Sequence, residues 1–167
     1  LLATGSAPVW PEIPGAELAI TSDAIFALEE QPERVLVVGG GYIAVEFAGI
    51  LHGLGSRVTQ IYRGPLFLRG FDSDIRTALA EEMRKKSIDL RFDANVVGLE
   101  RVPGGIRVLL AGGDELEVDQ VLYAIGRRPL TADLGLQTAG VEVSPSGAVV
   151  VDEYSRTNVP GIYAIGD

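Results

Sequence analysis

The sequence predicts a three-layer α/β fold that combines a parallel sheet with an antiparallel β-meander. Apolar, β-branched runs such as residues 34–38 are typical of parallel strands that are buried on both faces. Segments with helical spacing alternate with these runs, as in βαβ units. Farther along the chain, PGG and GGD turns separate three short strand-like segments, which indicates antiparallel strands joined by hairpins.

Two short elements are expected before the main sheet begins. LLATG, residues 1–5, has the pattern of a strand that runs into a glycine turn, and WPEIPG is a linker. Residues 21–23 can cap a short helix that extends through Glu29. The main sheet then starts with a strand at 34–38. A helix follows from the glycines to Gly55, and a second strand is expected at 57–62.

The second half of the chain adds a helix, two parallel strands and the meander. Asp72 to Lys86 is amphipathic, with acids in its first turn and bases in its last, which suits the helix dipole. GRRP, residues 126–129, is expected to be a turn at the carboxyl edge of the sheet. The two ends of the chain look like strands whose partners are missing. The strands are expected at 88–92, 96–101, 106–110, 115–118, 120–125 and 161–167.

A glycine-rich turn joins the first long strand to the helix. Gly39 can make the tight turn without a Cβ, and Gly41 lets a pyrophosphate approach the free N–H groups and dipole of the helix N-terminus. Ala44 fills the last position of the motif G-x-G-x-x-G/A. In this strand–turn–helix–strand context, the motif predicts a Rossmann-like dinucleotide site that includes Gly39, Gly40, Gly41 and Ala44. The alternative is a glycine turn with a purely structural role.

The end of the second strand indicates which dinucleotide is preferred. NAD-binding domains place an acid about 20 residues after the first glycine, where it binds the ribose 2′-hydroxyl. This sequence instead has Tyr62 and Arg63, with Arg69 in the same loop. Two guanidinium groups can bind a 2′-phosphate through charge-assisted hydrogen bonds, whereas an acid would repel it. NADP(H) is therefore favoured over NAD(H), the alternative being that both arginines are ordinary solvated charges.

Composition excludes several other classes of function. Lysine and arginine number 14 against 23 acids, a net charge of −9, so neither nucleic acid nor an anionic membrane is an expected partner. At 167 residues and 47% hydrophobic content, one soluble globular domain is expected. No apolar run approaches the roughly 20 residues that a membrane span needs, and no signal peptide is evident, which favours a cytoplasmic location. The absence of cysteine and a single histidine, His52, make a metal site unexpected.

Several segments together resemble a known family. They are LLATGSAP, ITSDAIFALEEQPERVLVVGGGYIAVEFAG, YRGPLFLRGFD, AIGRRP and VVVDEYSRTNVPGIYAIGD, which span essentially the whole chain. They resemble the FAD-dependent pyridine nucleotide-disulfide oxidoreductases, most of all the glutathione reductases. In that family an NAD(P)H domain is inserted in a FAD domain. The resemblance therefore implies a FAD-domain flank and linker at 1–20, an NADP(H)-binding domain at 21–129, and a return segment to the FAD and central domains at 130–167.

The resemblance also implies roles at the nicotinamide end. Tyr42 resembles the tyrosine that covers the flavin and swings aside when NADPH arrives. Glu46 resembles the carboxylate that contacts the nicotinamide carboxamide, and Ile43 lies beside the same pocket. Arg63 and Arg69 match the family's pair on the 2′-phosphate. From the residues alone, Tyr42 could equally be a packed aromatic and Glu46 a solvated charge.

Other segments that resemble the family lie near the ends of the chain. Gly126 and Arg127 match the turn that closes over the dinucleotide, although Arg127 could also be a surface charge. Thr4, Gly5 and Asp167 resemble FAD contacts. The family's own FAD glycine motif is not among these residues.

For the full-length protein, the resemblance implies hydride transfer from NADPH to FAD, then to an enzyme disulfide and finally to glutathione disulfide, in a homodimer. The family's redox cysteines and catalytic histidine lie outside this sequence, so these residues alone are expected to be inactive. Two alternatives stay open. One is a related mercuric, trypanothione, mycothiol or dihydrolipoamide-type enzyme, and the other is a dinucleotide-binding module without chemistry.

Overall fold

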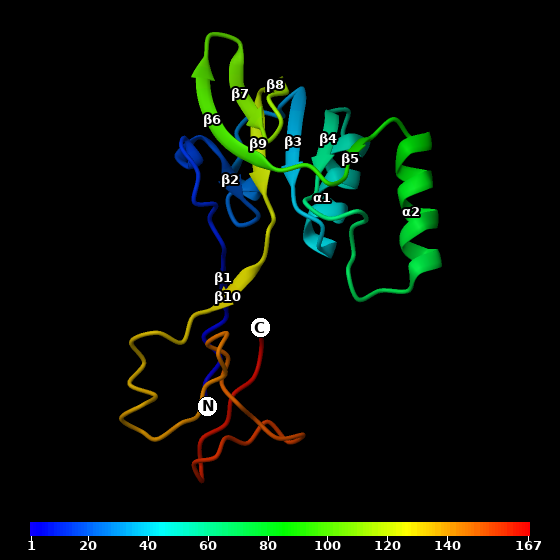
Figure 1. Ribbon diagram of the computed structural model, residues 1–167. Helices are drawn as coiled ribbons and strands as arrows, with labels where there is room; N and C mark the ends of the chain where they lie inside the picture. Colours follow the sequence, from blue (N-terminus) through cyan, green and yellow to red (C-terminus); the bar gives the residue numbers. More distant parts are fainter. The chain divides into compact units, whose positions relative to one another are not determined.

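The computed structural model describes residues 1–167 and divides into two compact units (Figure 1). One unit runs from Trp10 to Gly126, and the other combines Leu1–Val9 with Arg127–Asp167. These limits fall at 9/10 and 126/127, whereas the sequence suggested boundaries after residues 20 and 129. No helix in the structure is long and apolar enough to cross a membrane.

A five-stranded parallel sheet forms the centre of the Trp10–Gly126 unit, in the order β2-β9-β3-β4-β5. Strand β3 lies in the middle and is buried from Val35 to Val38, as expected for a strand covered on both faces. All strands run in one direction, so their carboxyl ends meet at one edge. The strands are β2 (Ile20–Thr21), β3 (Arg34–Val38), β4 (Arg57–Ile61), β5 (Asp89–Arg91) and β9 (Gln120–Tyr123).

The first of these strands corrects one prediction. Residues 21–23 were expected to cap a helix that extends through Glu29, but Thr21 belongs to β2 and pairs with Tyr123 of β9. Only a 3-10 turn, η2 (Ile25–Ala27), follows, and a similar turn, η1 (Ala16–Leu18), precedes β2. A strand of two residues is too short to show an alternating pattern, and its partner lies about a hundred residues away in sequence.

Helices and meander cover opposite faces of the sheet, which confirms the three-layer prediction (Figure 1). Alternate residues of β3 divide between the two cores: Val35 and Val37 pack with the helices, and Leu36 and Val38 pack with the meander. The covering elements are α1 (Tyr42–Gly53) and α2 (Ser73–Lys85) on one face, and β6 (Val96–Val102), β7 (Gly105–Leu110) and β8 (Glu115–Val118) on the other.

Both helices begin and end close to their predicted limits. Asp72 caps α2 because its side chain accepts hydrogen bonds from the N–H groups of Asp74 and Ile75, at 2.9 and 3.3 Å. Helix α1 ends just before Gly55, which adopts a positive φ of 104°. The N–H of Gly55 donates to the carbonyl of His52 at 2.9 Å, so the helix is closed as the sequence predicted.

The second unit is built from the two ends of the chain. Strand β1 (Ser6–Pro8) pairs antiparallel with β10 (Arg127–Pro129). The expected turn at 126–129 is therefore wrong beyond Gly126, which has a positive φ of 138°. Leu2 also bridges to Ala164 in parallel, so the two terminal segments are each other's partners rather than unpaired.

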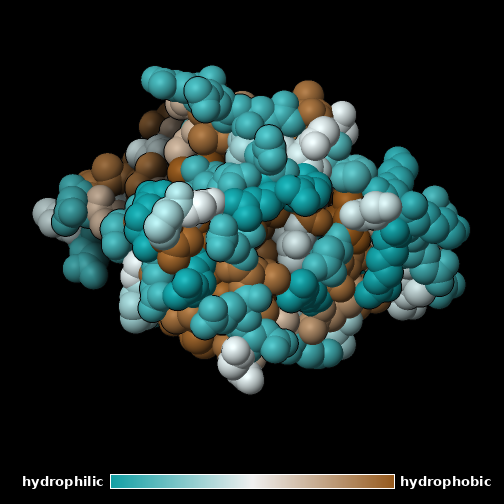
Figure 2. All heavy atoms as spheres, turned by 90° about the horizontal axis from the view of Figure 1, so that it is seen from above, coloured by the Kyte–Doolittle hydropathy of each residue, from teal (hydrophilic) through white to brown (hydrophobic).

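An ion pair ties the amino ends of the sheet to the meander. Arg34 donates to the carboxylate of Asp119 from its backbone N–H at 2.7 Å and from Nη2 at 2.6 Å. Nη2 also donates to the carbonyl of Gly104, and Nη1 lies 3.3 Å from Glu117. Figure 2 looks onto this end of the unit, where hydrophilic side chains cover much of the surface. The hydrogen bonds from Arg34 hold the pKa of Asp119 below its ordinary value.

We expect Asp119→Asn to lower the free energy of unfolding at pH 7 by roughly 1–2 kcal/mol, because charged hydrogen bonds at a partly exposed site are weakened. A lowered folded pKa means that this contribution is present above the unfolded pKa of about 3.9 and is lost as the pH falls through the folded value. Urea unfolding at pH 7 and pH 3 measures both effects. Asp89→Asn, at an exposed pair with Arg91, is the control. Equal losses at both pH values would contradict the prediction.

Candidate dinucleotide-binding site

The three glycines after β3 differ in what surrounds the position of a missing Cβ. Gly39 has a φ of 149°, and a Cβ at this position would strike the carbonyl group of Ala124. A Cβ on Gly40 would collide with the ring of Tyr62. Gly41 differs, because its Cβ would meet no atom within 4 Å. Two glycines therefore serve the packing of the protein, whereas the third leaves open space at the start of α1.

This open space lies at the N-terminus of α1. Gly41 is the N-cap residue, and no side chain caps the helix. The first turn contains no acid that could occupy the free N–H groups. Open space, uncapped N–H groups and the positive end of a helix dipole together fit a phosphate group. The predicted roles of Gly39, Gly41 and Ala44 thus have a consistent geometry, with Ala44 fully buried beneath the turn.

Hydrogen bonds from β4 and from the loop after it hold the glycine turn in place. The N–H of Gly39 donates to the carbonyl of Ile61 at 2.9 Å, and Gln60 Nε2 donates to the carbonyl of Gly39 at 3.0 Å. The carbonyl of Gly40 accepts from the N–H of Leu68 at 2.6 Å. The glycine turn and the loop that follows β4 are therefore one connected structure.

Two buried polar side chains lie near this edge and were not foreseen. Gln60 is 1% exposed, and its Oε1 has no hydrogen-bond partner although its Nε2 supports Gly39. Tyr123 ends β9 on the meander face, and its hydroxyl also has no partner. Burial raises the pKa of Tyr123 to about 12, so the hydroxyl is protonated at neutral pH. A glutamine within a strand carries no sequence signal for such a role.

The loop from Tyr62 to Phe71, here called the arginine segment, carries both predicted phosphate ligands. Arg63 and Arg69 are exposed, and neither side chain makes a hydrogen bond or an ion pair. Phe67, between them, is fully buried and packs edge-on against Phe92 with ring centroids 5.4 Å apart. The segment is thus anchored through its centre, and its two guanidinium groups are left free for a ligand.

The structure adds an acid that lies next to the arginine segment. Asp93 follows β5, and its N–H donates to the carbonyl of Gly64 at 3.1 Å. Its side chain is exposed and makes no ion pair. The end of β4 itself has no acid, as the sequence showed. The acid comes instead from the residues after the neighbouring strand β5, which are distant from β4 in the sequence.

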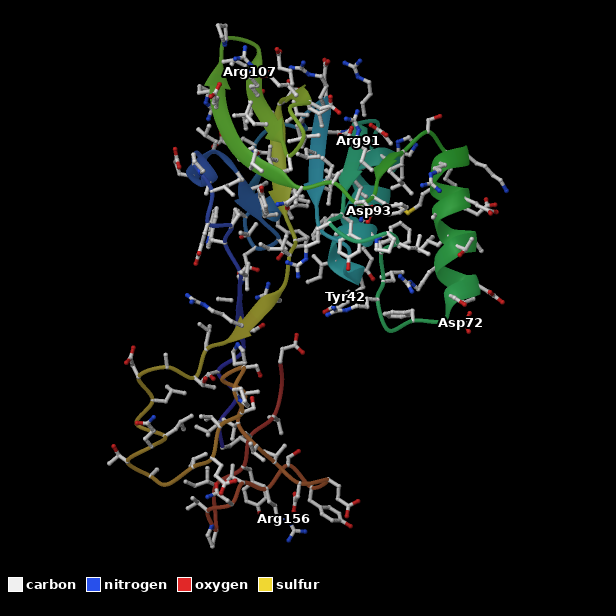
Figure 3. The ribbon with its side chains drawn as sticks, in the orientation of Figure 1. Tyr42, Asp72, Arg91, Asp93, Arg107 and Arg156 are labelled. Carbon is white, nitrogen blue, oxygen red and sulfur yellow. The ribbon has the colours of Figure 1, made fainter.

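The residues predicted for the nicotinamide end lie on the first turns of α1. Tyr42 is 55% exposed, Glu46 is exposed and Ile43 is half-buried. Figure 3 shows Tyr42 at the start of α1 and Asp72 at the start of α2, both at the end of the unit where the sheet strands finish. Tyr42 and Glu46 are neighbours on one helix face by their spacing of four. Neither side chain makes a hydrogen bond, an ion pair or a ring contact, and both are accessible.

The predicted flavin contacts come together in the unit formed by the chain ends. Thr4, Gly5 and Asp167 line one cavity of about 120 Å³, together with apolar residues from both ends. Ligand pockets for whole cofactors are typically about 300–1,000 Å³. The fit is therefore partial, since these residues can border only one part of a flavin cofactor.

Arg127 has a different environment from the free arginines. Its Nε donates to the hydroxyl of Ser6 at 2.8 Å and its Nη2 to the carbonyl of Ser6 at 2.7 Å. These bonds fix the guanidinium within the β1–β10 pair. Gly126 is exposed and has the positive φ noted above. The closing role over the dinucleotide stays a prediction for both residues.

Known proteins resemble this chain over its full length. The family model described as pyridine nucleotide-disulphide oxidoreductase matches residues 1–167. A glutathione reductase from Burkholderia cepacia is 53% identical over 167 residues, which are 100% of this chain and 37% of that protein. A trypanothione reductase from Trypanosoma congolense is 48% identical over 171 residues, 100% of this chain and 35% of that protein. The chain thus spans little more than a third of these relatives.

Solved structures agree with this result. The HOCl-induced flavoprotein disulfide reductase RclA from Escherichia coli has a TM-score of 0.89 and 36% identity, covering 98% of this chain and 38% of that one. An engineered water-forming NADPH oxidase bound to NADPH has a TM-score of 0.85 and 29% identity, covering 99% of this chain and 38% of that one. With a family match over every residue, this chain belongs to the pyridine nucleotide-disulphide oxidoreductase family.

Proposed function

We propose that this chain binds NADP(H) at the carboxyl edge of its parallel sheet. The observation that carries the proposal is the hydrogen bond between Gly40 and Leu68, which joins an uncapped helix N-terminus to a segment with two unpaired arginines. The N–H groups of α1 bind the pyrophosphate, and Arg63 and Arg69 bind the 2′-phosphate. Tyr42 and Glu46 then lie at the nicotinamide end.

We further propose that the full-length protein is an NADPH-dependent glutathione-disulfide reductase containing FAD. When bound, NADPH supplies a hydride to the flavin. The residues of this chain bind and orient the dinucleotide, and Thr4, Gly5 and Asp167 border part of the flavin site. Similarity to glutathione reductases supports the choice of substrate, with other disulfides as alternatives within the family. We also propose that the full-length protein is a cytoplasmic homodimer.

The isolated chain is expected to bind NADPH more tightly than NADH. Arg63→Ala and Arg69→Ala should each weaken NADPH binding by about tenfold or more, because a charged hydrogen bond contributes roughly 1.5–3 kcal/mol. Binding of NADH, which lacks the 2′-phosphate, should change little. Titration calorimetry measures the affinity of the parent chain and of each variant for both dinucleotides. Arg101→Ala, an exposed arginine on the meander strand β6, removes the same charge elsewhere and is the control. Equal affinities of the parent chain for both dinucleotides would refute the proposal.

Gly41→Ala tests the pyrophosphate position. The new Cβ enters open space, so the free energy of unfolding should fall by less than about 1 kcal/mol, the scale of a helix-cap change. Binding of NADPH and NADH should weaken alike, by about tenfold, because displacing a close contact costs roughly 1–3 kcal/mol. Gly40→Ala is the contrasting variant and should destabilise the fold through Tyr62. Unchanged binding by a folded Gly41→Ala chain would place the pyrophosphate elsewhere.

Glu46→Gln tests the nicotinamide end in the flavin-containing protein. If Glu46 orients the carboxamide, the variant should reduce the rate of flavin reduction by more than it weakens NADPH binding, since misorientation acts on the reacting geometry. Stopped-flow absorbance measures the rate, and its dependence on NADPH concentration measures binding. Glu82→Gln, an exposed glutamate on α2, is the control. A reduction rate equal to that of the parent would return Glu46 to the role of a solvated charge.

A further inference from the structure

One cation near the site points into the protein rather than into solvent. Arg76 lies on the first turns of α2 and is half-buried. Its Nε donates to the carbonyl of Phe67 at 2.7 Å, and its Nη2 donates to the carbonyl of Leu66 at 2.6 Å. The guanidinium group therefore binds two successive carbonyls in the centre of the arginine segment.

The arginine segment needs such an external anchor. Leu68 has a φ of 54°, the left-handed region, which is unfavourable for a residue with a Cβ. The N–H of the same residue donates to the carbonyl of Gly40. The centre of the segment is thus held at three places: by Leu68 on the glycine turn, by the buried ring of Phe67, and by the side chain of Arg76 from α2.

Helix α2 in turn fixes the position of Arg76. The cap provided by Asp72 sets the start of the helix, and the N–H of Arg76 donates to the carbonyl of Asp72 at 3.1 Å. The anchor therefore rests on a capped helix with its own core residues, Ala80 and Met83. A rigid element thus supports the segment that carries the two exposed arginines.

Arg76 is not arranged as a third phosphate ligand. Two of its nitrogens already donate to carbonyls at short distances, whereas Arg63 and Arg69 are exposed and have no partner. A half-buried guanidinium group that donates to backbone carbonyls stabilises the conformation of the loop that carries those carbonyls. Carbonyls without a donor at such a place would require the loop to move toward water.

We propose that Arg76 is a positioning residue for dinucleotide specificity. By binding the carbonyls of Leu66 and Phe67, it fixes the arginine segment so that Arg63 and Arg69 meet the 2′-phosphate. This inference rests on the proposed binding of NADP(H). It assigns the choice between NADPH and NADH partly to a residue that touches neither dinucleotide.

The test compares Arg76→Met with the parent chain by titration calorimetry with NADPH and with NADH. We expect the ratio of the two affinities to fall by about fivefold or more, since a segment that is no longer ordered must be ordered on binding. NADH binding should change little. Lys85→Met removes a cation from the same helix, where it pairs only with Glu82, and should leave the ratio unchanged.

A second comparison separates positioning from direct attraction. In a chain that already carries Arg63→Ala and Arg69→Ala, adding Arg76→Met should not change the ratio further, because no phosphate ligand remains to be positioned. A further loss in that background would show that Arg76 attracts the phosphate directly and would overturn the inference.

Arg76→Lys keeps the positive charge but lacks the planar guanidinium group that donates to two carbonyls at once. It should also lower the ratio, and full retention by Arg76→Lys would overturn the inference as well.

Amide hydrogen exchange gives a readout that does not depend on binding. The N–H of Leu68 should exchange faster in Arg76→Met than in the parent chain and in Lys85→Met, and unchanged exchange would overturn the inference. A parent chain without NADPH preference would overturn the proposed function and this inference with it. A parent chain with that preference, unaltered by Arg76→Met, would overturn this inference alone.

Discussion

The hydrogen bond from the N–H of Leu68 to the carbonyl of Gly40 sets the constraint on which the site depends. To reach this carbonyl, the loop after β4 must return across the glycine turn, which brings the ring of Tyr62 against Gly40 and leaves no room for a Cβ there. The same return puts Leu68 in the left-handed region and buries Phe67. One close approach thus explains a glycine, an unusual backbone conformation and a buried aromatic ring.

Some arginines of this acidic chain stabilise the fold, whereas Arg63 and Arg69 have no partner in the protein. Arg34 is paired with Asp119 and Arg76 binds carbonyls, so each stabilises a junction between separate segments of the fold. Exposed charges without partners cost little in water, and they keep their attraction for a ligand. The free state of Arg63 and Arg69 therefore has no structural explanation, although it is what an anion-binding loop requires.

Local patterns were sufficient for the main elements, but pairings between distant residues were not. The glycine motif, the helix from Asp72 to Lys86 and the meander were predicted because their signals lie within a few residues of one another. Strand β2 and the β1–β10 pair depend on partners about a hundred residues away, and were missed or misassigned as a helix and a turn. Gln60 and Arg76 act through backbone carbonyls, which have no side-chain signature, so only the fold reveals them.

The arrangement of the site also bears on what selects the disulfide substrate. The contacts that shape the proposed dinucleotide site lie between Gly39 and Ala124, and they concern the phosphates or the nicotinamide end. This chain is 53% identical to a glutathione reductase and 48% identical to a trypanothione reductase, although those names differ in the disulfide. Similar identity to both is expected if these residues bind only the common electron donor. Under the proposed function, the choice of disulfide is therefore assigned to parts of the full-length protein outside these residues, and substitutions at the arginine segment should change the preferred dinucleotide without changing the preferred disulfide.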